Sequence, residues 1–189
     1  MKKLVVSSLV ALFAAGSAQA APSGGRIEAF VGYDNNKFSA ADFNVDASTD
    51  GVVFGVGLGY DLAVSSGVAL GIDLEASDSS AELSASEGGI SAKASAERDL
   101  YAGGRITFAA SDRVNLYVKG GYTNARLKAS VTGGGLDESV SGTVDGFRVG
   151  GGVQFMISKS VYLGGEYRYS NYEGDYSRNQ VVGTLGFRF

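Results

Sequence analysis

Hydrophobic residues occupy every second position in eight segments of this chain, and this period of two restricts its possible folds more than any other feature of the sequence. Successive side chains of a β-strand point to opposite faces, so each segment is predicted to be a strand with one apolar and one polar face. The eight predicted strands cover residues 26–34, 52–62, 68–77, 99–108, 114–123, 147–157, 161–170 and 179–189.

The segments between the predicted strands alternate between long and short. Longer segments cover residues 35–49, 78–98, 124–143 and 171–178, whereas residues 63–67, 109–113 and 158–160 are short turns. This order is typical of an antiparallel up-and-down sheet whose two ends meet different environments. Outer-membrane barrels have short periplasmic turns, long extracellular loops and an even strand number. An eight-stranded soluble barrel, such as a lipocalin, is the competing architecture.

The charges on the polar face decide between these two architectures. A soluble barrel would bury its apolar face and carry charges outside, whereas here the apolar face carries no charge in any predicted strand. Buried ions are costly unless they are paired, so we expect acids and bases to pair inside a membrane barrel, with partners set by strand stagger. The predicted interior charge cluster comprises Glu28, Asp73, Glu75, Arg105, Lys119, Arg148, Glu166 and Arg168, with Arg188 on the same face.

Aromatic residues of the apolar face gather near the predicted strand ends. Two aromatic belts at the interfaces are typical of membrane proteins, although aromatic residues also favour strands in general. The predicted interface aromatics are Tyr33, Phe54, Tyr122, Phe147 and Tyr169 toward the longer connections, and Tyr60, Phe108, Phe155 and Phe189 toward the short turns.

The first twenty residues have the pattern of a secretory signal peptide. Lys2 and Lys3 precede an apolar run over residues 4–15, and Ala18, Gln19 and Ala20 form a small-x-small cleavage sequence. We therefore expect a signal peptide at residues 1–20 and one outer-membrane β-barrel domain at residues 21–189, a length that suits a single domain.

The composition excludes several classes of function. The chain has no cysteine and no histidine, so thiol chemistry, Ser-His catalysis and ordinary transition-metal sites are not expected. Asp42, Asp46 and Asp50 match no known calcium loop, and a solvated acidic loop is the expected alternative. A net charge of −4 argues against nucleic acid as a partner. We expect no enzyme and no cofactor.

The eight alternating segments, the Ala18-Gln19-Ala20 sequence and the final Gly186-Phe187-Arg188-Phe189 together resemble the small outer-membrane β-barrel proteins of Gram-negative bacteria. This group includes the transmembrane domain of outer membrane protein A, the outer membrane protein X type and the opacity-like porin family. The resemblance implies an all-β, eight-stranded antiparallel up-and-down transmembrane barrel in the bacterial outer membrane, surrounded by lipid and lipopolysaccharide and monomeric. It also implies that the barrel assembly machinery recognises Leu185, Phe187 and Phe189. The peptidoglycan-binding domain of the full-length A protein has no counterpart.

Function is expected to depend on the interior and on the long connections. Eight strands leave an interior just wide enough for side chains, so a plugged core and a structural or adhesion-like role through a surface or host ligand are expected. A small porin-like channel is the alternative. Hydrophobic and small residues alternate over residues 90–96, in register with Leu100, and again over residues 125–131. These two connections are therefore predicted either as protruding strands tipped by Gly88–Gly89 and residues 133–135, or as mobile polar loops. The mobile loops are the slightly favoured alternative.

Overall fold

The structure, a computed structural model, describes residues 20–40, 45–133, 136–174 and 176–189. Residues 1–19, which hold most of the predicted signal peptide, lie outside these ranges. The described part contains nine β-strands, and within it no helix is long and apolar enough to cross a membrane. The strands are β1 (Gly24–Ala40), β2 (Val45–Ser65), β3 (Val68–Ser79), β4 (Glu82–Glu87), β5 (Ile90–Ser111), β6 (Val114–Gly133), β7 (Leu136–Met156), β8 (Val161–Tyr172) and β9 (Tyr176–Arg188).

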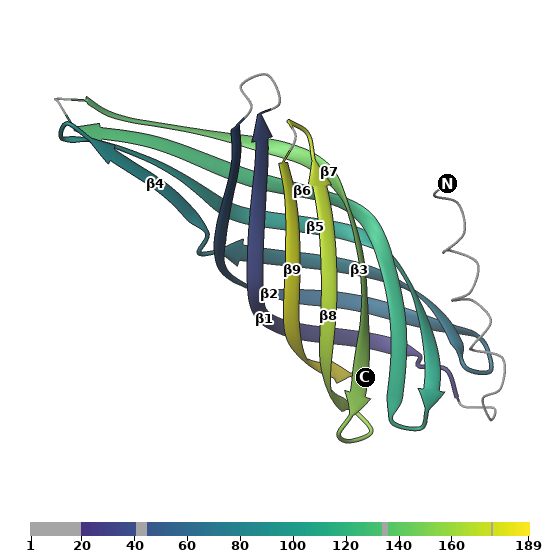
Figure 1. Cartoon of the computed structure of the whole chain (residues 1–189). Coiled ribbons are helices and arrows are strands. Elements are labelled where there is room, and N and C mark those ends of the chain that lie inside the picture. The colour runs from purple at the N-terminus through teal and green to yellow at the C-terminus, as the bar shows by residue number, and fades with distance from the viewer. Residues whose placement is uncertain (1–19, 41–44, 134–135, 175) are drawn as a thin grey trace, which may run out of the picture.

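The strands close into one antiparallel barrel (Figure 1). Strands that follow one another in the chain pair with each other, except β3 and β4; in addition, β1 pairs with β9 and β3 pairs with β5. Both β3 and β4 pair with β5, so together they form the third strand of the wall, interrupted at Ser80 and Ala81. The prediction of an eight-stranded up-and-down barrel is therefore confirmed.

The strands extend further at the outer end than the sequence pattern predicts. Residues 35–49 were expected to form a polar connection, but β1 and β2 continue in register through Asn35 and Asp50 and through Asn36 and Thr49. The segment 171–178 is likewise largely strand, because β8 ends at Tyr172 and β9 begins at Tyr176. Outside the bilayer, neither face of a strand has to be apolar, so the alternation disappears although the pairing continues.

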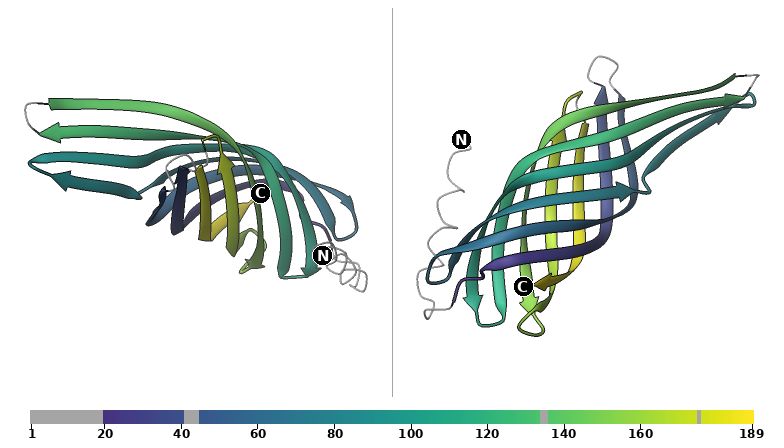
Figure 2. Two further views of the ribbon diagram at one scale, coloured as in Figure 1. Left: turned by 45° about the horizontal axis from the view of Figure 1, so that its top comes forward. Right: turned by 180° about the vertical axis from the view of Figure 1, so that it is seen from behind.

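Beyond the mouth of the barrel, β4 and the outer parts of β5, β6 and β7 form a four-stranded sheet that projects well past the other strands (Figures 1 and 2). We call this part, residues 82–98, 125–133 and 136–145, the projecting sheet. Gly88 and Gly89 turn the chain at its tip with φ angles of 59° and 82°, which the two-residue turn between β4 and β5 requires. Of the two alternatives, protruding strands are confirmed for these residues and the slightly favoured mobile polar loops are wrong, while residues 134 and 135 lie outside the described part.

A β-bulge separates the barrel part of β5 from its projecting part. Asp99 pairs with Ala125 and Ala96 pairs with Leu127, so Glu97 and Arg98 together face one residue of β6, Arg126. Because side chains alternate along a strand, the extra residue moves the alanines before the bulge to the opposite face. The expectation that Ile90, Ala92, Ala94 and Ala96 continue the face of Leu100 is therefore wrong.

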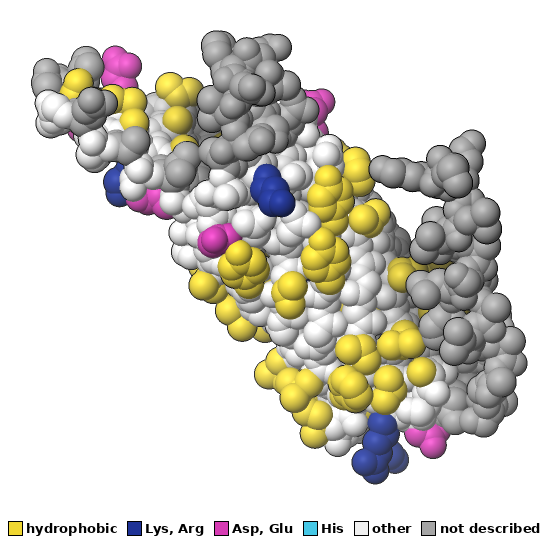
Figure 3. All heavy atoms as spheres, in the orientation of Figure 1, with side chains coloured by type: hydrophobic (Ala, Val, Ile, Leu, Met, Phe, Trp, Pro, Cys, Tyr) yellow, Lys and Arg dark blue, Asp and Glu magenta, His cyan; other side chains and the backbone are white. Residues whose placement is uncertain are grey.

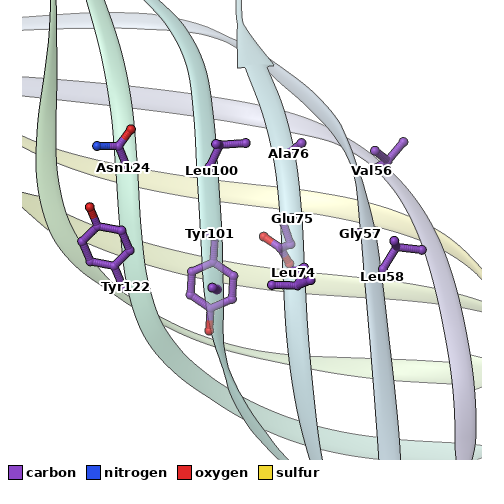
Figure 4. Close-up of a pocket in the computed structure, with 11 residues that line it drawn as sticks. Val56, Gly57, Leu58, Leu74, Glu75, Ala76, Leu100, Tyr101, Tyr122 and Asn124 are labelled. Carbon is purple, nitrogen blue, oxygen red and sulfur yellow. The ribbon is translucent and has the colours of Figure 1, made fainter.

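The outer surface of the barrel is apolar between its two ends. Figure 3 shows hydrophobic side chains over the visible wall, with charged side chains toward the ends. A hollow of about 550 Å³ lies on this surface, where Ala76 and Ala102 stand among larger side chains of β2, β3, β5 and β6 (Figure 4). Because its lining belongs to the lipid-facing wall, we assign the hollow to contact with lipid chains.

Candidate functional site

The interior of the barrel contains equal numbers of acidic and basic side chains. Among the described residues, seven bases and seven acids are buried, and all eight residues of the predicted interior charge cluster are among them. Strand alternation places them inside, since each lies on the face opposite the lipid-facing residues of its strand. The buried charges are Arg26, Arg105, Lys119, Arg148, Arg168, Arg178 and Arg188 with Glu28, Asp34, Asp61, Asp73, Glu75, Asp99 and Glu166.

Nearest the periplasmic turns, arginines alternate with carboxylates. The Arg26 Nη1 lies 2.5 Å from Asp61 Oδ2, and Arg188 Nη1 lies 2.6 Å from the same oxygen. The Arg105 Nε donates to Asp73 at 2.8 Å, and Arg26 also pairs with Asp73. Each of these carboxylates therefore has two basic partners, which offsets the cost of burying it.

Glu75 and Glu166 hold the middle of the lumen together. Glu75 pairs with Lys119, with Arg168 Nη1 at 3.2 Å and with Arg148 Nη1 at 3.4 Å. Glu166 accepts from Lys119 Nζ at 2.7 Å and from Arg168 Nε at 2.5 Å. These five residues come from β3, β6, β7 and β8, so the cluster joins opposite walls of the barrel.

The outermost layer was not predicted as part of the cluster. Asp99 lies 2.5 Å from Arg148 Nη2 and 3.0 Å from Arg178 Nη1, while Arg178 Nη2 lies 2.5 Å from Asp34 Oδ2. Arg178 had been assigned to the connection before the last strand. The signal was present in the sequence, because Arg178 has the same parity as Gln180, which lies on the polar face of that strand.

Aromatic rings fill the remaining interior space above glycines of the adjacent strand. Tyr117, Tyr162 and Phe30 face Gly152, Gly186 and Gly55 in the strand register. A Cβ atom added at Gly186 would lie 2.1 Å from Tyr162 Cζ, and one at Gly152 would lie 2.6 Å from the Tyr117 hydroxyl. The glycines therefore provide the room that the rings occupy.

The rings also support the buried charges. The guanidinium of Arg105 lies 4.0 Å from the centre of the Tyr117 ring, and that of Arg168 lies 4.1 Å from the centre of the Phe30 ring. The Tyr117 hydroxyl donates to Glu166 at 2.6 Å. Rings and ion pairs thus form one packed network along the lumen.

Two tyrosines close the outer end of the lumen. The rings of Tyr172 and Tyr176 stack with their centres 4.9 Å apart, and Ala125 packs against them. Leu127 and Val144 of the projecting sheet contact the same cluster. A small cluster of aromatic and aliphatic side chains therefore lies where the interior meets the mouth.

The outer rim carries two matching hydrogen-bonded groups, which we call the rim clamps. In one, Tyr33 and Asn35 both donate to Asp50, at 2.5 and 2.7 Å. In the other, Tyr122 and Asn124 donate to Asp145, at 2.5 and 2.6 Å. In both groups a tyrosine and the asparagine two residues after it bond the same aspartate. These bonds hold the two exposed tyrosines at the boundary of the apolar wall, as expected for interface anchors.

Asp50 and Asp145, the two acids of the rim clamps, lie beyond the membrane-spanning segments. Each stands two residues further out along its strand than the last lipid-facing residue, Val52 or Phe147. Hydrogen bonds from Tyr122 and Asn124 hold the pKa of Asp145 below that of an ordinary carboxyl, and bonds from Tyr33 and Asn35 do the same for Asp50. Both carboxylates therefore remain charged at neutral pH.

The projecting sheet has an apolar inner face, which continues the inner wall of the barrel. In the register, Ala96 pairs with Leu127 and Ala94 with Ala129, which in turn pairs with Val140. A groove of about 300 Å³ runs between this face and residues of β1 and β2, including Asn36 and Thr49. The inner face of the projecting sheet therefore faces the mouth of the barrel across this groove.

Among the described residues, the outer part of β7 has no partner strand on the side that pairs with β8 further down. Pairing with β8 begins at Gly146, and the carbonyl of Asp145 accepts the last bond, from the Glu173 N–H. Alternate residues of an antiparallel strand direct their backbone groups to the same side. Asp137, Ser139, Ser141 and Thr143 therefore present N–H and C=O groups at an open edge.

The remaining predicted residues lie on the outer wall. Tyr33, Phe54, Tyr60, Tyr122, Phe147, Phe155 and Phe189 are exposed, while Phe108 and Tyr169 are partly covered. The predicted assembly signal is exposed as well: Leu185 and Phe187 face outward, and Phe189 is 75% exposed. The N–H of Phe189 donates to the Gly25 carbonyl at 2.9 Å, which joins the last residue of the sequence to β1.

Few groups of the described part suit metal binding or catalysis. No group of three or more His, Cys, Asp or Glu side chains among the described residues could hold a metal ion. Asp42 lies outside the described residues, and the same holds for the side chain of Asp46. The buried carboxylates each have basic partners, so the geometry supports ion pairing.

Comparisons with known proteins agree with this architecture. Residues 5–189 match the model of the outer membrane protein beta-barrel domain. Neisserial surface protein A has a structure with a TM-score of 0.58 and 19% identity, covering 88% of this chain and 98% of that one. The attachment invasion locus protein Ail of Yersinia pestis gives a TM-score of 0.56 and 18% identity, covering 88% and 99%.

These identities are low enough that the two solved structures establish the fold alone. Among curated proteins, none matches this sequence significantly. The family model, in contrast, spans nearly the whole sequence, and the closed antiparallel wall with its apolar outside is what that family requires. This chain therefore belongs to the outer membrane protein beta-barrel domain family and is a barrel of the bacterial outer membrane.

Proposed function

We propose that this protein is a non-enzymatic, non-conducting barrel that presents the projecting sheet at the cell surface and binds a partner polypeptide there by strand addition. The observation that carries the proposal is the open edge of β7, where alternate residues from Asp137 to Thr143 have unpaired backbone groups. An exposed strand edge offers the hydrogen-bonding groups that an added strand needs.

The form of the projecting sheet supports this role. Its strands are paired along most of their length, so an added strand meets a preformed edge and loses little binding energy to ordering of the protein. The exposed Val140 beside that edge offers an apolar surface to the partner's side chains.

Two of the structurally similar proteins have names that refer to the cell surface or to attachment. One is called a surface protein, and the other is an attachment invasion locus protein, which has also been solved in complex with the heparin analogue sucrose octasulfate. These properties belong to those proteins. For this chain they support an adhesion-like role as the class of function to test first.

Strand addition can be tested by hydrogen exchange on the refolded chain in lipid nanodiscs. Without a partner, the N–H groups of Ser139 and Ser141 should exchange rapidly, whereas those of Val140 and Gly142, which face β6, should be protected. A bound peptide selected from a library should protect Ser139 and Ser141. Ser139→Pro should abolish this binding because it removes an edge N–H, while Ser139→Ala should retain it. Unchanged binding by Ser139→Pro would contradict strand addition.

The dense ion pairing inside the barrel supports a non-conducting barrel over the porin-like alternative. Glu75, Lys119 and Glu166 are almost completely buried among their partners, and the stacked tyrosines cover the outer end. In planar bilayers, the refolded protein should give no discrete conductance steps. Reproducible steps that disappear with heat-denatured protein would favour the channel instead.

We also propose that Leu185, Phe187 and Phe189 form the signal for barrel assembly. Phe189 is mostly exposed and stacks on Phe187 with ring centres 6.3 Å apart, so it contributes little buried area. Deleting Phe189 should reduce the amount of protein in the outer membrane several-fold while lowering the stability of the refolded barrel by about 1 kcal/mol or less. Phe155→Ala, at the same end of the wall, should assemble normally. Normal assembly without Phe189 would refute this role.

A further inference from the structure

The two open edges of the projecting sheet carry the same charge. The open part of β7, residues 136–145, contains Asp137, Glu138 and Asp145 and no basic residue. The other outer strand, β4, contains Glu82 and Glu87 and again no basic residue. The bases of the projecting sheet lie on its two central strands.

Two of the four bases on the central strands pair with acids within the sheet, while Arg98 and Lys128 are exposed. Lys93 lies 2.9 Å from Glu82, and Arg126 lies 3.5 Å from Glu97 and donates to Ser141 at 2.9 Å. The edges of the projecting sheet are therefore acidic, and its bases lie away from them on the central strands. A polyanion approaching the sheet would meet these edges, and like charges would oppose its binding.

The acidic edge also disfavours pairing of two copies. If two β7 edges met in antiparallel register, their acids would lie near one another with no base of either strand to offset them. Like charges opposite each other on neighbouring strands are destabilising. Charged residues on a strand edge are a common means of preventing such self-association.

We infer that the β7 edge binds a basic, extended polypeptide that has apolar residues at alternate positions, an inference that rests on the proposed strand addition. On the outer face, lysine or arginine of the partner would lie near Asp137. On the inner face, its apolar side chains would extend the row formed by Val140 and Val144, with Glu138 at the tip of the sheet.

The β7 edge suits such a strand better than the β4 edge. The open part of β7 spans residues 136–145, whereas β4 spans only residues 82–87. The start of β4 is also occupied, because the Thr49 hydroxyl donates to the Glu82 carbonyl at 3.1 Å. A partner at β7 therefore gains more backbone hydrogen bonds.

Three probes would test the charge preference on the full chain refolded in phosphatidylcholine nanodiscs, with empty nanodiscs as the blank. The first is a labelled peptide of about ten alternating valines and lysines, which matches the length of the edge. The second replaces every lysine with glutamate, and the third is a heparin fragment. Fluorescence anisotropy should show binding of the lysine peptide only, and binding should weaken as salt is raised.

Charge reversal should locate the interaction. The double variant Asp137→Lys, Glu138→Lys should bind the lysine peptide about tenfold more weakly and gain affinity for the glutamate peptide. Asp112→Lys, at a periplasmic turn, should leave both affinities unchanged. Equal binding of the two peptides, binding of heparin alone, or no binding of the lysine peptide would each overturn the inference.

The edge variant Ser139→Pro separates this inference from the proposed function. If both peptides bind equally and Ser139→Pro abolishes both, strand addition stands and the charge preference is wrong. If the lysine peptide binds wild type and Ser139→Pro equally, the peptide binds elsewhere, and strand addition at β7 fails together with the inference built on it.

Discussion

The barrel and the projecting sheet share the same strands but have opposite polarity. In the barrel part of β6, Lys119 faces inward and Tyr122 faces lipid; in the projecting part, Leu127 faces inward and Lys128 faces outward. The comparison shows that alternation alone does not assign an apolar residue to a particular face. The environment at each height decides, because lipid surrounds the barrel and an aqueous, polar layer surrounds the projecting sheet.

The two regions also differ in how their charges are balanced. Inside the barrel, buried Arg148 bridges Glu75 and Asp99, and each charge depends on the others. On the projecting sheet, Lys93 and Glu82 form an exposed pair of the kind that contributes little to stability. An ion pair inside the barrel and one on the projecting sheet therefore contribute very different amounts to the free energy of unfolding.

The largest effect should follow from removing an interior acid. Glu75→Leu would leave Lys119, Arg148 and Arg168 without one of their carboxylates, and leaving buried charges uncompensated typically costs about 3–5 kcal/mol. Denaturant unfolding in detergent micelles, followed by circular dichroism and by heat-modifiable migration on gels, would measure it. Ala76→Leu, the adjacent lipid-facing position, should change the free energy of unfolding little. A loss below about 1 kcal/mol for Glu75→Leu would contradict the interdependence of the interior charges.

Because the barrel and the projecting sheet differ in polarity, a valine-to-arginine substitution on β6 should change the free energy of unfolding by different amounts in the two regions. Val118→Arg would place a charge on the lipid face near the middle of the wall, which costs about 2–4 kcal/mol. Val131→Arg, on the inner face of the projecting sheet, should cost about 0.5 kcal/mol or less, because its surroundings are aqueous. The same unfolding measurement serves both variants. Similar losses at both positions would show that the projecting sheet is embedded in an apolar environment.

An intermediate effect is expected where a glycine makes room for an interior ring. The Cβ of Gly186→Val would overlap the ring of Tyr162, and overpacking of this kind costs about 1–3 kcal/mol. Gly183→Val, on the lipid face of the same strand, has only one neighbouring atom at 3.8 Å and serves as the control. If both variants unfold at the same denaturant concentration, the packing of rings over glycines does not limit stability.

The smallest effect should come from a rim clamp. The pKa of Asp145 is lowered in the folded state, so its hydrogen bonds stabilise the protein above the ordinary carboxyl pKa of about 4 and are lost as the pH falls through the lower folded value. Asp145→Asn should therefore differ slightly from wild type at pH 7 and converge with it in strong acid. Asp112→Asn should show no such convergence. A difference that grows on acidification would contradict this sign.

Much of the interior could be predicted because it depends on parity within single strands. Alternation together with the cost of charge in lipid placed Glu28, Glu75 and Arg148 inside, and all three are buried. Arg178 was missed because the polar residues around it weaken the alternation just outside the membrane. The face of Ala94 was assigned wrongly because a bulge changes parity without leaving a mark in the hydrophobic pattern.

The sequence by itself determined the strand number, the lipid-facing side of each strand and the charged character of the interior, because these follow from the local period of two and from the cost of charge in lipid. Only the tertiary structure decided which charges meet, such as Glu75 with Arg168, since stagger between strands sets those distances. It also decided that the strands continue past the membrane as a sheet with an open edge, because pairing between strands persists where the alternation that predicts them has ended.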